Sequence, residues 1–202
     1  AKKIEKNIVK LTSANEIENA VKGDKIAVLI GRDVSFAVDD KTEYTVSCVE
    51  DLFSEGIGFD DAIATLKEVA KGRELICYDY KNLSKTYGFD QDKFFDVMIA
   101  AHLARGSAPI KSLEQVLGAD GYEIGAVELL TESQQLRAQL AQQGLNKLFF
   151  DIEQPLCVVL RNMEERGVRV STDVLKALEK KYGEIIEGLT KEIYSLAGET
   201  FN

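Results

Sequence analysis

Two carboxylates in this sequence have the type and setting that metal-dependent chemistry on a phosphate ester requires. Asp79 directly follows the apolar run Leu75-Ile76-Cys77-Tyr78, and Asp96 lies between Phe95 and Val97. Carboxylates that converge from a strand and a helix can hold two divalent cations about 4 Å apart, and such a pair activates water and stabilises the transferred phosphoryl group. Asp79 and Asp96 are therefore the candidate residues for a nuclease metal site.

The other residues that such a site needs are missing from the sequence. An Asp-x-Glu pair on the first strand of a meander would put two carboxylates on one face, because alternate residues of a strand share a face. Residues 26–31 read Ile-Ala-Val-Leu-Ile-Gly and offer no carboxylate. A Tyr-x-x-x-Asp pair on a later helix would orient water and metal, but Tyr122 is followed four residues later by Ala126, and the stretch between Glu132 and Asp151 contains no acid.

Each candidate also has a structural interpretation. Asp79 fits a turn at the end of a strand, and Asp96 fits a helix surface or the first turn of a helix. His102 falls in the last turn before Gly106, where an imidazole suits the negative end of a helix, and a general base would need an orienting carboxylate that the sequence does not identify. We therefore assign no catalytic, cofactor-binding or metal-binding residue, and treat Asp79 and Asp96 as vestigial candidates.

Composition and net charge indicate a soluble globular protein and exclude several classes of binding protein. The chain has 202 residues, of which 45% are hydrophobic and 29% charged, as in soluble globular proteins. Its net charge of −9 opposes a general attraction to phosphate backbones and excludes a nucleosome-like or tail-like binder. Three cysteines without a CxxC pair and one histidine exclude structural zinc and favour a reduced compartment.

Targeting and binding motifs are absent from the sequence. No signal peptide and no run of about 18 apolar residues occurs, so we expect a cytoplasmic protein without a membrane partner. No Walker, GxGxxG, GxSxG or zinc-protease motif occurs either. The chain begins without methionine, which suggests an excerpt of a longer protein.

The helices and strands that must position the candidate residues change in type at about residue 80. Before it, the sequence pattern predicts a helix that begins with a capping box, an antiparallel meander of three strands, a helix that Asp60 caps and Gly72 ends, and a short buried strand. In sequence order these are residues 13–21, the runs 25–30, 34–38 and 44–48, residues 60–71, and residues 75–78.

After residue 80, the sequence pattern predicts helices only. Pro155 lies inside one of them as a kink or restart. The last two helices are long, are joined by a short turn after Gly167, and are expected to form a protruding antiparallel hairpin. The helices are residues 83–87, 93–104, 112–117, 127–143, 145–166 and 171–197, and the last has an apolar stripe of Leu175, Leu178, Tyr182, Ile185, Leu189, Ile193 and Leu196.

Two segments carry a resemblance to a known family. Residues 153–168 match the pattern E-x-P-L-x-x-V-L-x-x-M-E-x-x-G-V, and residues 193–202 match I-x-x-L-A-G-x-x-F-N. In both, the chain resembles bacterial DNA polymerase I, family A, where the first pattern marks the passage from the exonuclease domain into the polymerase thumb. Thinner similarity upstream extends the resemblance over most of the chain, chiefly from Phe94 onward.

The resemblance implies an α/β (α+β) ribonuclease-H-like exonuclease fold, with a small mixed sheet and flanking helices, followed by the helical hairpin. It divides the chain into a 3′–5′ exonuclease-like domain, 1–144, and the truncated start of the polymerase thumb, 145–202. Proofreading members carry a four-carboxylate metal site, so the missing pairs imply the degenerate version, an inactive scaffold for the polymerase domain. The polymerase motifs would lie beyond Asn202, so this fragment needs no cofactor, whereas the parent would use Mg²⁺ and bind DNA.

Two alternatives stay open, and with them the question of whether the chain is itself an enzyme. The first is a working metal-dependent exonuclease with an altered ligand set such as Asp79 with Asp96. The second is a free-standing helical interaction module, in which the stripe from Leu175 to Leu196 binds a separate protein.

Overall fold

A computed structural model describes residues 4–31, 33–48, 56–106, 112–118 and 124–200 of the chain. The chain forms two compact units, Ala1–Glu165 and Arg166–Asn202, and each is described by itself. The first unit therefore runs 21 residues past the predicted domain boundary at 144/145. That boundary, as a division between two functional domains, stays a prediction.

The first unit is built on a six-stranded mixed sheet with the order β1-β4-β3-β2-β5-β6. Strands β2, β3 and β4 form the predicted antiparallel meander, whereas β2, β5 and β6 are parallel neighbours and β1 pairs in parallel with β4. This sheet confirms the predicted α/β class and is consistent with a ribonuclease-H-like fold. The strands are β1 (Asn7–Leu11), β2 (Lys25–Ile30), β3 (Val34–Ala37), β4 (Thr42–Val46), β5 (Glu74–Cys77) and β6 (Phe94–Asp96).

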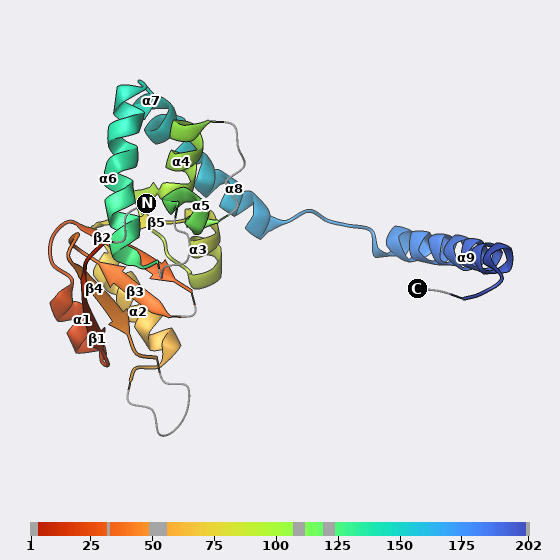
Figure 1. Cartoon of the computed structure of the whole chain (residues 1–202), viewed down its shortest axis with the longest axis horizontal. Coiled ribbons are helices and arrows are strands. Elements are labelled where there is room, and N and C mark those ends of the chain that lie inside the picture. Colours follow the sequence, from red (N-terminus) through yellow and green to blue (C-terminus); the bar gives the residue numbers. More distant parts are fainter. Residues whose placement is uncertain (1–3, 32, 49–55, 107–111, 119–123, 201–202) are drawn as a thin grey trace. The chain divides into compact units, whose positions relative to one another are not determined.

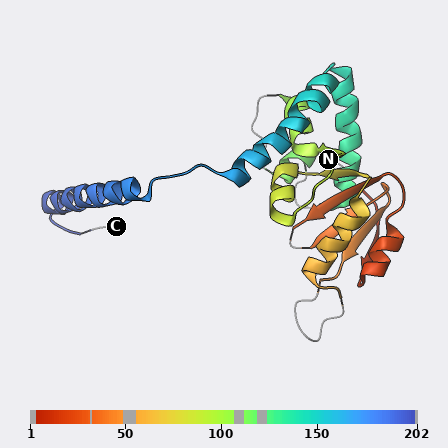
Figure 2. The same ribbon diagram turned by 180° about the vertical axis from the view of Figure 1, so that it is seen from behind.

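Helices cover both faces of the sheet (Figures 1 and 2), because successive strand residues point to opposite sides. On β5, Leu75 and Cys77 enter one apolar core and Ile76 enters the other; on β6, Phe94 and Phe95 divide in the same way. The first core includes α1 (Ala14–Ala20), α2 (Phe59–Ala70) and α3 (Tyr80–Tyr87), and the second includes α4 (Val97–Arg105), α5 (Leu113–Leu117) and α6 (Ala126–Gln142).

Two strands were not predicted. The helix expected over 93–104 begins only at Val97, because Phe94–Asp96 pairs with β5 as strand β6. Asn7–Leu11 forms β1 at the sheet edge. Both segments are short, and their strand character depends on pairing with distant residues rather than on local periodicity.

Two further predicted helix starts are wrong. Helix α2 begins at Phe59 after Gly58, and Asp60 and Asp61 lie in its first turn instead of capping it. Their negative charge still favours the positive end of the helix. Helix α3 begins at Tyr80, three residues before the predicted start, because the side chain of Asp79 caps it.

The segment around Pro155 forms one helical run with a change of pitch. Residues Asn146–Leu148 (α7) lead into a π-helical turn, η1 (Phe149–Glu153), and then into α8 (Gln154–Arg166). Proline cannot donate a backbone hydrogen bond and its ring clashes with the carbonyl four residues earlier. The irregularity predicted at Pro155 is therefore observed as a wider, π-helical turn that ends two residues before the proline.

The second unit contains one long helix, α9 (Thr172–Ala197). The side chain of Ser171 accepts a hydrogen bond from the Val174 backbone N–H at 3.4 Å, and Gly198 ends the helix with a φ of 76°. This confirms the predicted helix, and a single helix cannot bury its own apolar stripe. The hairpin with α8 stays a prediction. Within the described residues, no helix has the length and apolar character to cross a membrane.

Candidate functional site

The sheet brings Asp79 and Asp96 together. Strands β5 and β6 are parallel neighbours, with Cys77 opposite Asp96 in the register, so Asp79 leaves β5 beside the end of β6. The Asp79 backbone N–H donates to Oδ1 of Asp96 at 3.2 Å. The two candidates from the sequence are therefore neighbours in space, as a metal-binding pair would have to be.

The carboxylate of Asp96 is fully buried and is engaged by the backbone. Its Oδ2 accepts a hydrogen bond from the Tyr80 N–H at 2.8 Å, and its Oδ1 accepts from the N–H groups of Met98 at 2.9 Å and Ile99 at 3.4 Å. Asp96 is thus the N-cap of α4 and also holds the start of α3. Asp96 therefore lies at the start of a helix, as one part of the sequence interpretation expected, but it is buried at the end of β6 and not on a helix surface.

Burial governs the ionisation of Asp96. Removal from water raises the pKa of its carboxyl to about 6, although the N–H groups of Tyr80, Ile99 and Met98 act in the opposite direction. The neighbouring charge of Asp79 also raises this pKa. An oxygen whose lone pairs already accept N–H groups is a poor ligand for a cation, so this carboxylate has little to offer a metal ion.

Asp79 serves as a turn residue at the end of a strand, as one interpretation of the sequence predicted. Its backbone is left-handed, with a φ of 55° and a ψ of 68°, and its Oδ1 accepts a hydrogen bond from the Asn82 N–H at 3.2 Å as the N-cap of α3. Aspartate tolerates this backbone conformation because its short side chain bonds locally. The side chain is partly exposed.

Asp79 lines a groove of about 630 Å³. Its wall at the end of β2 is apolar, and α3 and α5 form its other sides. Tyr78, which follows β5, also lines the groove. Burial raises the pKa of its phenol, and the charges of Asp79, Asp96 and Glu114 raise it further. The groove is lined by Val28, Leu29, Ile30, Gly31, Tyr78, Asp79, Asn82, Leu83, Thr86, Tyr87, Ser112, Leu113, Glu114 and Ile124.

This donor set does not fit a pair of divalent cations, which would need several converging oxygens. In the part of the chain that the structure describes, no three His, Cys, Asp or Glu side chains are grouped so that they could hold a metal ion. Tyr122 lies outside the described residues. His102 lies in the last turn of α4, as predicted, and its side chain is exposed.

The thiols are placed as apolar filling rather than as nucleophiles. Cys77 and Cys157 are buried, and Cys48 is partly buried. Burial raises the pKa of Cys77 well above its ordinary value and that of Cys157 to about 12, and the charge of Asp96 raises both. Neither buried thiol ionises near neutral pH, so neither can attack a substrate.

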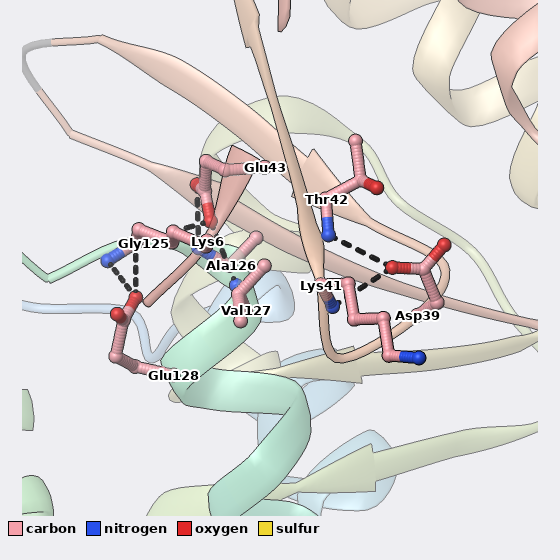
Figure 3. Close-up of polar contacts among 9 residues, drawn as sticks. All are labelled: Lys6, Asp39, Lys41, Thr42, Glu43, Gly125, Ala126, Val127 and Glu128. Carbon is pink, nitrogen blue, oxygen red and sulfur yellow. Dashed lines mark hydrogen bonds and ion pairs between the residues drawn. The ribbon is translucent and has the colours of Figure 1, made fainter. Parts of the chain in front are cut away.

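A buried network that the sequence analysis missed joins β4 to α6 (Figure 3). Oε1 and Oε2 of Glu43 accept hydrogen bonds from the N–H groups of Ala126 and Val127, both at 2.8 Å. Lys6 lies 3.3 Å from Glu43 and also pairs with Glu128. The carboxylate of Glu43, on β4, thereby caps the N-terminus of α6. No local sequence pattern predicts this contact between distant residues.

Gly125 permits this close approach. A Cβ atom there would lie 2.3 to 2.6 Å from the carboxylate of Glu43. The Gly125 N–H donates to Oε2 of Glu128 at 2.9 Å. The Gly-x-x-Glu spacing was a local signal for part of this network, because an acid at the third helical position often bonds back to the N-cap. The network stabilises the fold and offers no open site.

Comparison with known proteins relates the chain to one group of enzymes. No family model matches. The chain is 43% identical over 67 residues to DNA polymerase I of Streptococcus pneumoniae serotype 4 (strain ATCC BAA-334 / TIGR4), covering 33% of the chain and 8% of the relative. It is 32% identical over 147 residues to the thermostable DNA polymerase I of Thermus caldophilus, covering 70% of the chain and 18% of the relative.

A third relative gives the same result. The chain is 27% identical over 157 residues to DNA polymerase I of Bacillus subtilis (strain 168), covering 71% of the chain and 18% of the relative. The chain therefore spans at most 18% of the length of these relatives. These homologues support the interpretation that the chain is a fragment of a bacterial DNA polymerase I.

The burial of Asp96 predicts a pH dependence of stability. Because its pKa is higher in the folded chain, the folded state holds the proton more tightly, and the contribution of this group to stability falls as the pH rises from about 4 to about 6. The stability advantage of the wild type over Asp96→Asn should therefore shrink by up to about 3 kcal/mol between pH 4 and pH 7. Urea unfolding at each pH measures it, and parallel profiles would contradict the assignment.

The contact of Gly125 with Glu43 predicts a destabilising substitution. Gly125→Ala should lower the free energy of unfolding by about 2 kcal/mol or more, because the new methyl group displaces the carboxylate that caps α6. Gly31→Ala is the matched control, since a Cβ at Gly31 meets no atom within 4 Å. Equal unfolding curves for the two variants would show that the close approach is unimportant.

Proposed function

We propose that this chain is a segment of a bacterial DNA polymerase I, an enzyme of DNA replication and repair, and that its first part is a 3′–5′ exonuclease-like domain without catalytic activity. Residues 145–202 are the beginning of the polymerase thumb. The similarity to relatives of that name over up to 71% of the chain supports this identity of the parent protein. The mixed sheet with helices on both faces supports the exonuclease-like domain.

The proposed loss of activity rests on the residues at the ends of β2, β5 and β6. The end of β2 brings Leu29, Ile30 and Gly31 to the groove in place of carboxylates. The carboxylate of Asp96 accepts backbone N–H groups. Asp79 alone of the two candidates lines the groove, where Glu114 also contributes a carboxylate. Among the described residues, however, no three His, Cys, Asp or Glu side chains are grouped so that they could hold a metal ion, and phosphodiester hydrolysis of this type uses two.

A scaffolding role fits such a domain. Clustered carboxylates repel one another when no metal neutralises them, so their loss relieves a cost to stability. The apolar cores on both faces of the sheet do not depend on those carboxylates. The domain then holds the polymerase domain in place, and DNA is bound by the parent enzyme, which would use Mg²⁺.

An active exonuclease with an altered ligand set remains the second candidate. The observation in its favour is the close placement of Asp79 and Asp96, with 3.2 Å between the Asp79 nitrogen and Oδ1 of Asp96. Its weakness is that a metal ion would have to compete with the N–H groups that Asp96 already accepts.

A nuclease assay separates the two. We expect the 202-residue chain to leave 5′-labelled single-stranded DNA unshortened with Mg²⁺ or Mn²⁺, at the level of the Asp79→Ala variant. The thermal midpoint should move by less than about 1 °C with either metal, since a ligand bound only by the folded state would raise it. Metal-dependent shortening that Asp79→Ala abolishes would establish the active exonuclease instead.

A further inference from the structure

The start of α6 depends on two buried carboxylates. The first N–H groups of a helix have no partner within the helix. At α6, Ala126 and Val127 donate theirs to Glu43, and Gly125 donates to Glu128. The side chains of Glu43 and Glu128 are each only 5% exposed. Three backbone N–H groups at this helix end are therefore held by two negative charges that water hardly reaches.

Lys6 is the cation that both carboxylates share (Figure 3). Its Nζ lies 3.3 Å from Oε2 of Glu43 and also pairs with Oε2 of Glu128. Among the described residues, Lys6 makes the only ion pairs of these two carboxylates. A buried charge that loses its partner is strongly destabilising. Without Lys6, two like charges would remain side by side at the start of the helix.

The segment that contains β1 brings Lys6 to this place. We call residues 4–11 the β1 segment. Strand β1 pairs with β4 along its whole length, and Lys6 directly precedes it. Leu11 is buried in the first apolar core, and Ile4 packs against the second. The position of Lys6 at α6 therefore depends on the pairing of β1 with β4.

Strand β1 is also the element of the sheet that can leave at the smallest cost. It lies at the edge of the sheet and has β4 as its one neighbour in the sheet. It is five residues long. Local opening of a protein begins at elements with few partners. Detachment of β1 would break no pairing among the other five strands, but it would take Lys6 away from α6.

The helix end that Lys6 holds lies next to the groove. Ile124 lines the groove and directly precedes Gly125, the N-cap of α6. Helix α6 also packs against β2, whose end forms the apolar wall of the same groove. Disorder at the start of α6 would therefore extend to a residue that lines the groove.

We infer that the β1 segment is a strap that controls the order of the start of α6. Its Lys6 neutralises Glu43 and Glu128, and these carboxylates hold the first N–H groups of the helix and thereby the groove wall at Ile124. Lys6 is thus a positioning residue that acts through two other side chains. The strap belongs to the fold of the first unit and does not depend on whether the groove cleaves DNA.

Hydrogen exchange of single amides in the 202-residue chain tests the strap. In Lys6→Met, the amides of residues 125–127 should exchange about tenfold faster or more, because their acceptors repel each other. The amides of residues 98–99 are the internal control, since Asp96 holds them outside this network. Lys10→Met is the matched variant, because Lys10 lies on β1 and has no ion pair among the described residues. It should leave both sets of amides unchanged.

A double variant tests whether charge is the cause, and it also serves if Lys6→Met alone folds poorly. Glu128→Gln alone should lower the thermal midpoint of the chain, because Lys6 loses one of its two partners. Combined with Lys6→Met, the same substitution should raise the midpoint above that of Lys6→Met, because it removes one of two uncompensated buried charges.

Three results would overturn the inference. Unchanged exchange of residues 125–127 in Lys6→Met would show that the start of α6 keeps its order without the strap. Equal acceleration at residues 98–99, or in Lys10→Met, would show a general loss of stability. A midpoint of the double variant at or below that of Lys6→Met would show that Lys6 contributes by packing and not by its charge.

Discussion

The fold depends on a buried carboxylate that serves the backbone. Asp96 accepts N–H groups of Asp79, Tyr80, Met98 and Ile99, and so joins the ends of β5 and β6 to the starts of α3 and α4. The first turn of a helix leaves N–H groups without partners, and burial makes each one costly unless an acceptor reaches it. The residue that a nuclease would turn toward a metal ion is here a structural acceptor.

A second buried carboxylate repeats this solution at another helix. Glu43 accepts the N–H groups of Ala126 and Val127, while Lys6 balances its charge and Gly125 leaves room for it. Two acidic side chains thus satisfy the N-termini of three helices. These carboxylates find their hydrogen-bond partners within the chain, which agrees with the scaffolding role that we propose.

Helix α8 connects the candidate site to the surface of the unit. Gln154 at its start accepts a hydrogen bond from the backbone of Asp96, and the exposed residues Leu156 and Met163 lie on the opposite side of the helix. The strand that ends at Asp96 therefore helps to set the position of this helix.

The sequence by itself determined the elements with strong local patterns: the meander over β2 to β4, the strand β5, the helices α5, α6 and α9, and the lack of an Asp-x-Glu pair. Only the tertiary structure decided that β1 and β6 are strands, that Asp96 is buried beside Asp79, and that Glu43 caps α6. It also decided that Leu156 and Met163 face outward. The reason is that periodicity and caps are properties of neighbouring residues, whereas pairing, burial and capping from a distance depend on which remote segment arrives, and local sequence carries little record of that.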